Sequence, residues 1–128
     1  MTPSFSLFNH LFTLFTDEVH ANTIDYISDG YATFPFVFVT HPRDERIENN
    51  DIIGVLRETV RVYGKRTDYI TVDDIVSKID MVTSLRFSGN GYSFSRTSIN
   101  IIPLIEDLNG TQLIHYSITL TFNYNKER

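Results

Sequence analysis

The 128-residue chain contains no cysteine, no tryptophan and no long uninterrupted apolar segment. Without cysteine it cannot form a disulfide, a thiolate metal site or a cysteine nucleophile. Because no stretch approaches the about 18 apolar residues that a bilayer requires, we expect no membrane-spanning helix. The N-terminus has no basic region before its apolar part, so we expect no secretory signal. The net charge of −5 argues against a general phosphate-binding surface.

Motifs that carry chemistry are also scarce. Gly64-Lys65-Arg66-Thr67 differs from a phosphate-binding loop, because Arg66 separates the lysine from the hydroxyl residue. No serine lies in a Gly-x-Ser-x-Gly setting, and the Lys/Arg-Gly-Phe/Tyr signature of RNA-binding sheets is absent. The four histidines, which lack a metal-binding spacing, are His10, His20, His41 and His115. We therefore expect no catalytic residue, metal site or cofactor, and a role other than that of an enzyme.

Aromatic residues are abundant, with seven Tyr and ten Phe. This composition suits strands and assembly surfaces better than disorder. The length predicts a single domain over residues 1–128, large enough to bury a core of its own.

The clearest pattern is a strict alternation from Ile114 to Asn125, which predicts a strand with one buried face and one polar face. The buried face would hold Ile114, Tyr116, Ile118, Leu120, Phe122 and Tyr124. The polar face would hold His115, Ser117, Thr119, Thr121, Asn123 and Asn125, none of which is an acid, a lysine or an arginine. Interface cores are depleted in charge, so we predict that this face, or the edge of the strand, contacts a neighbouring subunit. Asn109-Gly110 predicts a hairpin turn before the strand, which would begin near Gln112.

Three further strands are predicted. The first covers residues 33–40, with Pro35 at its start or on an edge. The second covers residues 52–64 and places Arg57 and Arg61 on one face, where we expect solvent or the acidic groups of a neighbour. The third covers residues 92–105 and reaches an edge or a bend at Pro103.

Two helices complete the predicted fold. Thr2-Pro3 is a good helix start, and apolar residues at three- and four-residue spacing continue the first helix to residues 16–18. Thr71 and Asp74 match a capping box, which predicts a second helix over residues 71–85 with Asp73 and Asp74 in its first turn, where acids stabilise the helix dipole. The sequence therefore predicts an α+β fold, with two helices and a mostly antiparallel four-stranded sheet in the order α-β-β-α-β-β.

The most charged stretch, residues 41–51, has the sequence HPRDERIENND. Its small apolar content predicts a mobile loop, either a solvated hairpin connection or a segment that orders against a partner. The charged side chains that we regard as candidate partner contacts are Arg43, Asp44, Glu45, Arg46 and Glu48.

The order of segments resembles the tail terminator proteins of long-tailed bacteriophages, also called tail completion or head–tail joining proteins. An apolar N-terminal helix precedes a connector and the Pro-containing strand Phe34–Val39. The segment Glu58–Gly64 then leads through a polar linker into the helix Asp73–Ile79. Asp107-Leu108-Asn109-Gly110, followed by His115-Tyr116-Ser117, is similar to the acidic-Gly turn and the His-led last strand of that family. The charged 41–51 loop has no counterpart in the resemblance.

The resemblance implies a structural virion protein that forms a ring, usually a hexamer, on the head-proximal end of the tail tube. Such a ring stops tube elongation and provides the docking surface for the filled head. Its implied partners are other copies of the chain, the tail tube protein and a head-completion or connector protein. DNA would pass through the lumen without specific binding, and the ring would assemble in the host cytoplasm. The alternatives are another neck or head-completion protein, or a small ferredoxin-like ligand-binding domain or enzyme.

Overall fold

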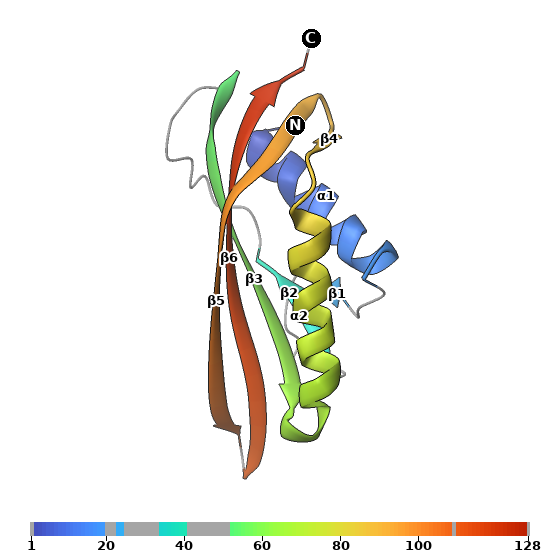
Figure 1. Cartoon of the computed structure of the whole chain (residues 1–128), viewed down its shortest axis with the longest axis vertical. Helices are drawn as coiled ribbons and strands as arrows, with labels where there is room; N and C mark the ends of the chain where they lie inside the picture. Colours follow the sequence, from blue (N-terminus) through green and yellow to red (C-terminus); the bar gives the residue numbers. More distant parts are fainter. Residues whose placement is uncertain (1, 20–22, 25–33, 41–51, 109, 128) are drawn as a thin grey trace.

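A computed structural model describes residues 2–19, 23–24, 34–40, 52–108 and 110–127. Its central strand is β6 (Thr111–Lys126), which is the predicted C-terminal strand. On one side β6 pairs antiparallel with β3 (Ile53–Lys65), and on the other with β5 (Tyr92–Leu108). The long β5–β6 hairpin reaches the lower end of the molecule (Figure 1).

Shorter strands extend the sheet on both sides. The strand β2 (Phe36–Val39) pairs antiparallel with β3, and β4 (Phe87–Gly89) pairs antiparallel with the start of β5. The two-residue strand β1 (Thr23–Ile24) adds to β2 in parallel, giving the order β1-β2-β3-β6-β5-β4. In the described part of the chain the antiparallel sheet thus has five strands, whereas the sequence predicted four. The predicted four-strand count is wrong because β4 is too short to show an alternation and adjoins the Asn90-Gly91 turn.

Pro35 and Pro103, the two prolines predicted in strands, lie beside or within a strand. Pro35 follows a cis peptide bond and directly precedes β2, which confirms its place at a strand start. Pro103 does not end its strand, because β5 remains paired with β6 as far as Leu108. It does lie on a sheet edge, because beyond Phe94 no described strand pairs with β5 on the edge away from β6.

The first helix, α1 (Pro3–Asp17), begins where the sequence predicted, and the backbone N–H of Phe5 donates to Thr2 Oγ1 at 3.3 Å. The second helix, α2 (Tyr69–Thr83), begins two residues before its predicted start. A short 3₁₀ helix, η1 (Arg66–Asp68), joins it directly to β3, and the Asp68 carboxylate accepts a hydrogen bond from the N–H of Lys65 at 3.0 Å.

The predicted capping box at Thr71 is therefore wrong, because Thr71 already lies inside α2. Asp73 and Asp74 also lie beyond the first turn of α2, which contains no acidic residue. Since the effect of a helix dipole on a charge fades within about one turn, it does not account for these two aspartates.

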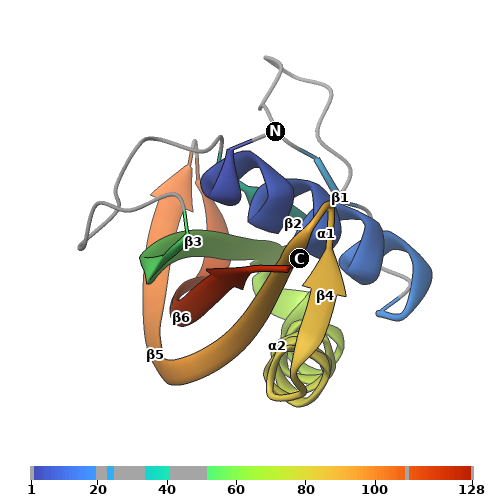
Figure 2. The same ribbon diagram turned by 90° about the horizontal axis from the view of Figure 1, so that it is seen from above.

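Both helices pack on one face of the sheet, which we call the inner face. The sheet curls around them, as the view from above shows (Figure 2). Helix α2 packs on β3 and β6, and α1 packs on β1, β2, β4 and β5. The fully buried side chains of this core include Leu7, Leu11, Phe15, Leu56, Ile79, Ile118, Leu120 and Phe122. Burial of each such side chain stabilises the fold by about 1.5–3 kcal/mol.

The predicted alternation of the last strand is confirmed from Ile118 to Tyr124, where the even-numbered side chains are buried on the inner face. Ile114 is only partly buried, because it borders a hollow between the end of the hairpin and Tyr69 at the start of α2. Because β6 is paired along both edges, a subunit contact through its edge is excluded, and only its polar face can contact a neighbour.

Candidate functional site

The face of the sheet that points away from the helices, which we call the outer face, gathers six of the residues predicted as subunit contacts. The β3–β6 ladder pairs Arg57 with Thr121, Arg61 with Ser117, and Tyr63 with His115. Thr119 lies between these pairs, opposite Thr59. Because neighbouring side chains of paired strands lie about 5 Å apart, these residues form one continuous surface. The predicted contacts brought together here are Arg57, Arg61, His115, Ser117, Thr119 and Thr121.

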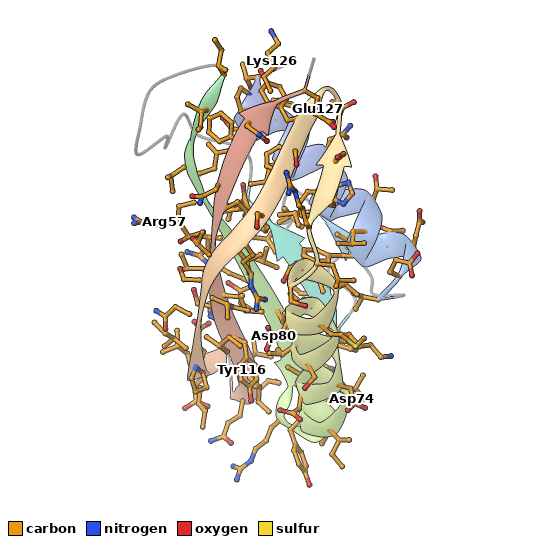
Figure 3. All side chains as sticks on the ribbon, turned by 45° about the horizontal axis from the view of Figure 1, so that its top comes forward. Arg57, Asp74, Asp80, Tyr116, Lys126 and Glu127 are labelled. Carbon is orange, nitrogen blue, oxygen red and sulfur yellow. The ribbon has the colours of Figure 1, made fainter. Side chains whose placement is uncertain are left out.

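Charge on the outer face is mostly basic, although the chain as a whole is acidic. Arg57 is exposed and projects away from the sheet (Figure 3), and Arg61 is partly buried. No carboxylate among the described residues lies within ion-pair distance of either arginine. Alternation along the strands also places Lys65 and Glu106 on this face. The outer face thus presents two guanidinium groups without a carboxylate partner in the part of the chain that the structure describes.

An aromatic row crosses the lower part of the outer face. The rings of Tyr63 and His115 stack with their centroids 4.2 Å apart and a 13° interplanar angle. Phe36 on β2 continues the row, with its ring centroid 5.1 Å from that of Tyr63. We expected His115 on a wet strand surface, but its side chain is buried by this stacking. His115 Nδ1 lies 3.2 Å from Oε1 of Glu106 on β5, which holds the imidazole in place.

The surroundings of the Tyr63 hydroxyl shift its pKa. Burial raises its pKa above the usual value of 10.0, and the negative charge of Glu106 adds to this effect. The positive charge of Arg61 and a hydrogen bond with the Arg61 side chain act in the opposite direction. The phenol therefore stays neutral at physiological pH and serves as a hydrogen-bonding and stacking group.

Two buried polar atoms on this face have no hydrogen-bond partner among the described residues, namely Nε of Arg61 and Nε2 of His115. A buried polar group without a partner costs about 1–3 kcal/mol, and such groups are rare in folded proteins. Both atoms have almost no accessible surface, so another molecule could reach them only if these side chains moved.

Apolar side chains adjoin the polar ones. Ile102 and Leu104 lie on β5 opposite Ser117 and His115 and are 46% and 43% exposed. They were not among the predicted contacts, because Pro103 was expected to bring an edge or a bend to this part of the strand. A usable signal was present, since residues 101–105 are apolar at both even and odd positions and so predict two covered faces.

The remaining predicted contacts, Arg43, Asp44, Glu45, Arg46 and Glu48, lie outside the described residues, as does the whole 41–51 loop. The predicted ordering of that loop against a partner therefore stays a prediction.

A separate hollow of about 390 Å³ lies at the opposite end of the outer face, where β3, β5 and β6 meet. Its lining combines apolar residues such as Ile53 and Val55 with the hydroxyl and amide side chains of Ser93, Ser95, Asn123 and Asn125. Arg86 is the only charged side chain among its described lining residues, and its Nε donates to Ser93 Oγ at 3.1 Å. The described lining therefore offers no pair of acid and base groups for proton transfer.

The described residues contain no group of three or more His, Asp or Glu side chains placed to hold a metal ion. None of the described helices is both long and apolar enough to cross a bilayer. Compared with known proteins, the chain matches no family model and no curated sequence.

Proposed function

We propose that the chain is a structural protein of a long-tailed bacteriophage that forms a ring on the head-proximal end of the tail tube. In this role it stops tube elongation and provides the surface on which the head docks. Copies of the chain contact one another through the outer face. The tail tube protein and a head-completion or connector protein bind on the two sides of the ring.

The observation that carries this proposal is the composition of the outer face. It combines uncharged hydroxyl groups, exposed aliphatic side chains and two arginines that have no carboxylate partner among the described residues. Interface cores are enriched in arginine and aromatic residues and depleted in lysine and acids. A face of this kind suits contact with another protein subunit better than contact with water alone.

The net charge of −5 supports the proposed passage of DNA. An acidic protein repels the phosphate backbone, so the genome slides through the lumen without sticking. Assembly takes place in the host cytoplasm, and the finished ring belongs to the virion.

The ferredoxin-like alternative fits less well. The described elements run α1, β1, β2, β3, α2, β4, β5, β6, whereas a ferredoxin-like domain follows the order β-α-β-β-α-β. The hollow beside Arg86 also lacks the paired titratable groups, within its described lining, that general acid–base catalysis needs.

Removal of the gene from the phage that carries it tests the proposal. Electron microscopy of the lysate is expected to show tails of abnormal length and filled heads without tails. Supplying the wild-type chain from a plasmid restores joined particles. Tails of normal length that join to heads in the absence of the gene would contradict the proposed function.

A further inference from the structure

We infer that the outer face of one copy is covered by helix α2 of the next copy, with Asp73 and Asp74 facing Arg57 and Arg61. This inference rests on the proposed self-assembly and specifies the two surfaces that meet. The occupant of the outer face is thus a second copy of this chain, presented through the exposed side of α2.

Helix α2 exposes large apolar side chains that the described part of the chain does not cover. Ile70 and Met81 on the helix are each 63% exposed, and Leu85, two residues beyond its end, is 68% exposed. A spacing of eleven residues places Ile70 and Met81 on one side of the helix, where Asp74 and Ser77 also lie. Large aliphatic side chains gathered in this way favour contact with another surface.

The two aspartates of α2 have no structural role in the described part of the chain. Both are exposed, and neither forms an ion pair with a described residue. Lys78 lies one turn beyond Asp74, but the structure records no ion pair between them. Asp80, by contrast, pairs with Arg96 of the same copy. Asp73 and Asp74 are therefore available to the cations of a neighbour.

The outer face matches α2 in both charge and apolar character. It offers Arg57 and Arg61 as cations, and Ile102 and Leu104 as aliphatic contacts. Arg57 and Arg61 stand roughly 13 Å apart along β3. Ile70 and Met81 stand roughly 16 Å apart along α2. The exposed side of the helix is therefore long enough to cover both arginines.

The two surfaces lie on opposite sides of the molecule. Figure 3 shows Arg57 on the side of the sheet and Asp74 on the far side of α2. A contact between them joins each copy to the next in a head-to-tail manner and leaves one free surface at each end. Heterologous contacts of this kind close into rings when the rotation between copies permits.

Thiol cross-linking tests this contact in a chain that has no cysteine of its own. The test variant carries Ser77→Cys on α2 and Thr121→Cys on the outer face, in the full-length chain at millimolar concentration. A short bismaleimide is expected to produce a ladder of dimers, trimers and larger species on a denaturing gel. The control variant carries Thr13→Cys on the exposed side of α1 with Thr121→Cys and is expected to produce no ladder.

Charge reversal then identifies the facing groups. In the cross-linking background, Arg57→Asp together with Arg61→Asp is expected to reduce the ladder at least about fivefold, because it places like charges opposite each other. Adding Asp73→Arg and Asp74→Arg is expected to restore it. The matched control adds Asp17→Arg and Glu18→Arg at the end of α1 instead, and this change is expected not to restore the ladder.

The outcomes distinguish failure of the proposed contact from failure of the proposed function. Absence of the ladder, or its appearance with the α1 control, overturns the docking of α2. If rings still form and joined phage are still produced in that case, the proposed function stands and only the choice of surface is wrong. If the ladder forms while deletion of the gene leaves tails normal, the contact is correct and the proposed function fails.

Discussion

Arg96 on β5 donates a hydrogen bond from Nη1 to Oδ1 of Asp80 in the last turn of α2, at 2.7 Å. The same nitrogen lies 2.9 Å from the backbone carbonyl oxygen of Asp80 and 3.0 Å from Oγ1 of Thr83. The guanidinium is largely buried, whereas the Asp80 carboxylate is about half exposed. The cation thus sits at the negative end of the α2 dipole and ties the helix to the sheet.

Replacement of this arginine is expected to destabilise the fold. Arg96→Met removes the three bonds and leaves the hydroxyl of Thr83 without this donor, so we expect a loss of about 2–3 kcal/mol in the free energy of unfolding. Urea denaturation measures the effect. Arg86→Met is the matched control, because Arg86 is exposed and its one recorded bond is to Ser93. A loss within about 0.5 kcal/mol is expected there, and equal losses in the two variants would refute the proposed role of Arg96.

A side chain at Gly64 is expected to destabilise the fold. It lies in β3 where the strand passes under α2, and a Cβ atom there would overlap a methyl group of Val72. Gly64→Ala is therefore expected to lower the free energy of unfolding by about 1–3 kcal/mol, through overpacking. Adding Val72→Ala makes room for the new methyl group, so the loss in the double variant should be smaller than the sum of the two single losses. Additive losses in urea denaturation would show that the contact is not the cause.

His10 is expected to make stability depend on pH. Its ring stacks on Phe87 with centroids 4.0 Å apart, and burial lowers its pKa below the usual value of 6.5. As pH falls through 6.5 the unfolded chain takes up a proton that the folded chain resists, so this contribution to stability is present above pH 6.5 and lost below it. His10→Phe keeps a stacking ring and should reduce the fall in urea midpoint between neutral pH and the folded pKa. An unchanged pH dependence would show that another group is responsible.

Lysine on the outer face is expected to block assembly and spare folding. Thr119 and Thr121 are partly exposed at the centre of the face, so Thr119→Lys and Thr121→Lys place charges in the proposed interface without entering the core. Circular dichroism and thermal melting should resemble those of the wild type, while sedimentation should show the loss of assembled rings. Asn9→Lys on the exposed side of α1 serves as the control. Normal rings from both threonine variants would exclude this face as the subunit contact.

The parts of the fold with strong periodic patterns were predictable from the sequence. The alternation of residues 118–124 and the Thr2-Pro3 helix start both correspond to the observed elements. The start of α2 was misplaced because η1 carries the chain into the helix from β3, so that Thr71, although a good capping residue, lies in the helix interior. A local sequence pattern predicts the presence of a helix more reliably than it predicts the residue at which the helix begins.

The candidate site was predictable in its polar residues and not in their surroundings. Period-two patterning alone placed Arg57, Arg61 and Ser117 on outward faces, and the observed register then brought them together. The burial of His115 depends on Tyr63, which belongs to a strand more than fifty residues earlier and stacks on it only because of that register. Such pairings between distant strands are set by tertiary structure, which single-sequence patterns do not contain.

The most direct test is electron cryomicroscopy of the neck of the phage particle that carries this chain. The account predicts a closed ring of copies at the head-proximal end of the tail tube, with Arg57 and Thr119 of each copy covered by the next copy. A particle in which the chain is absent from the tail, or in which the outer face of every copy is open to solvent, would contradict it.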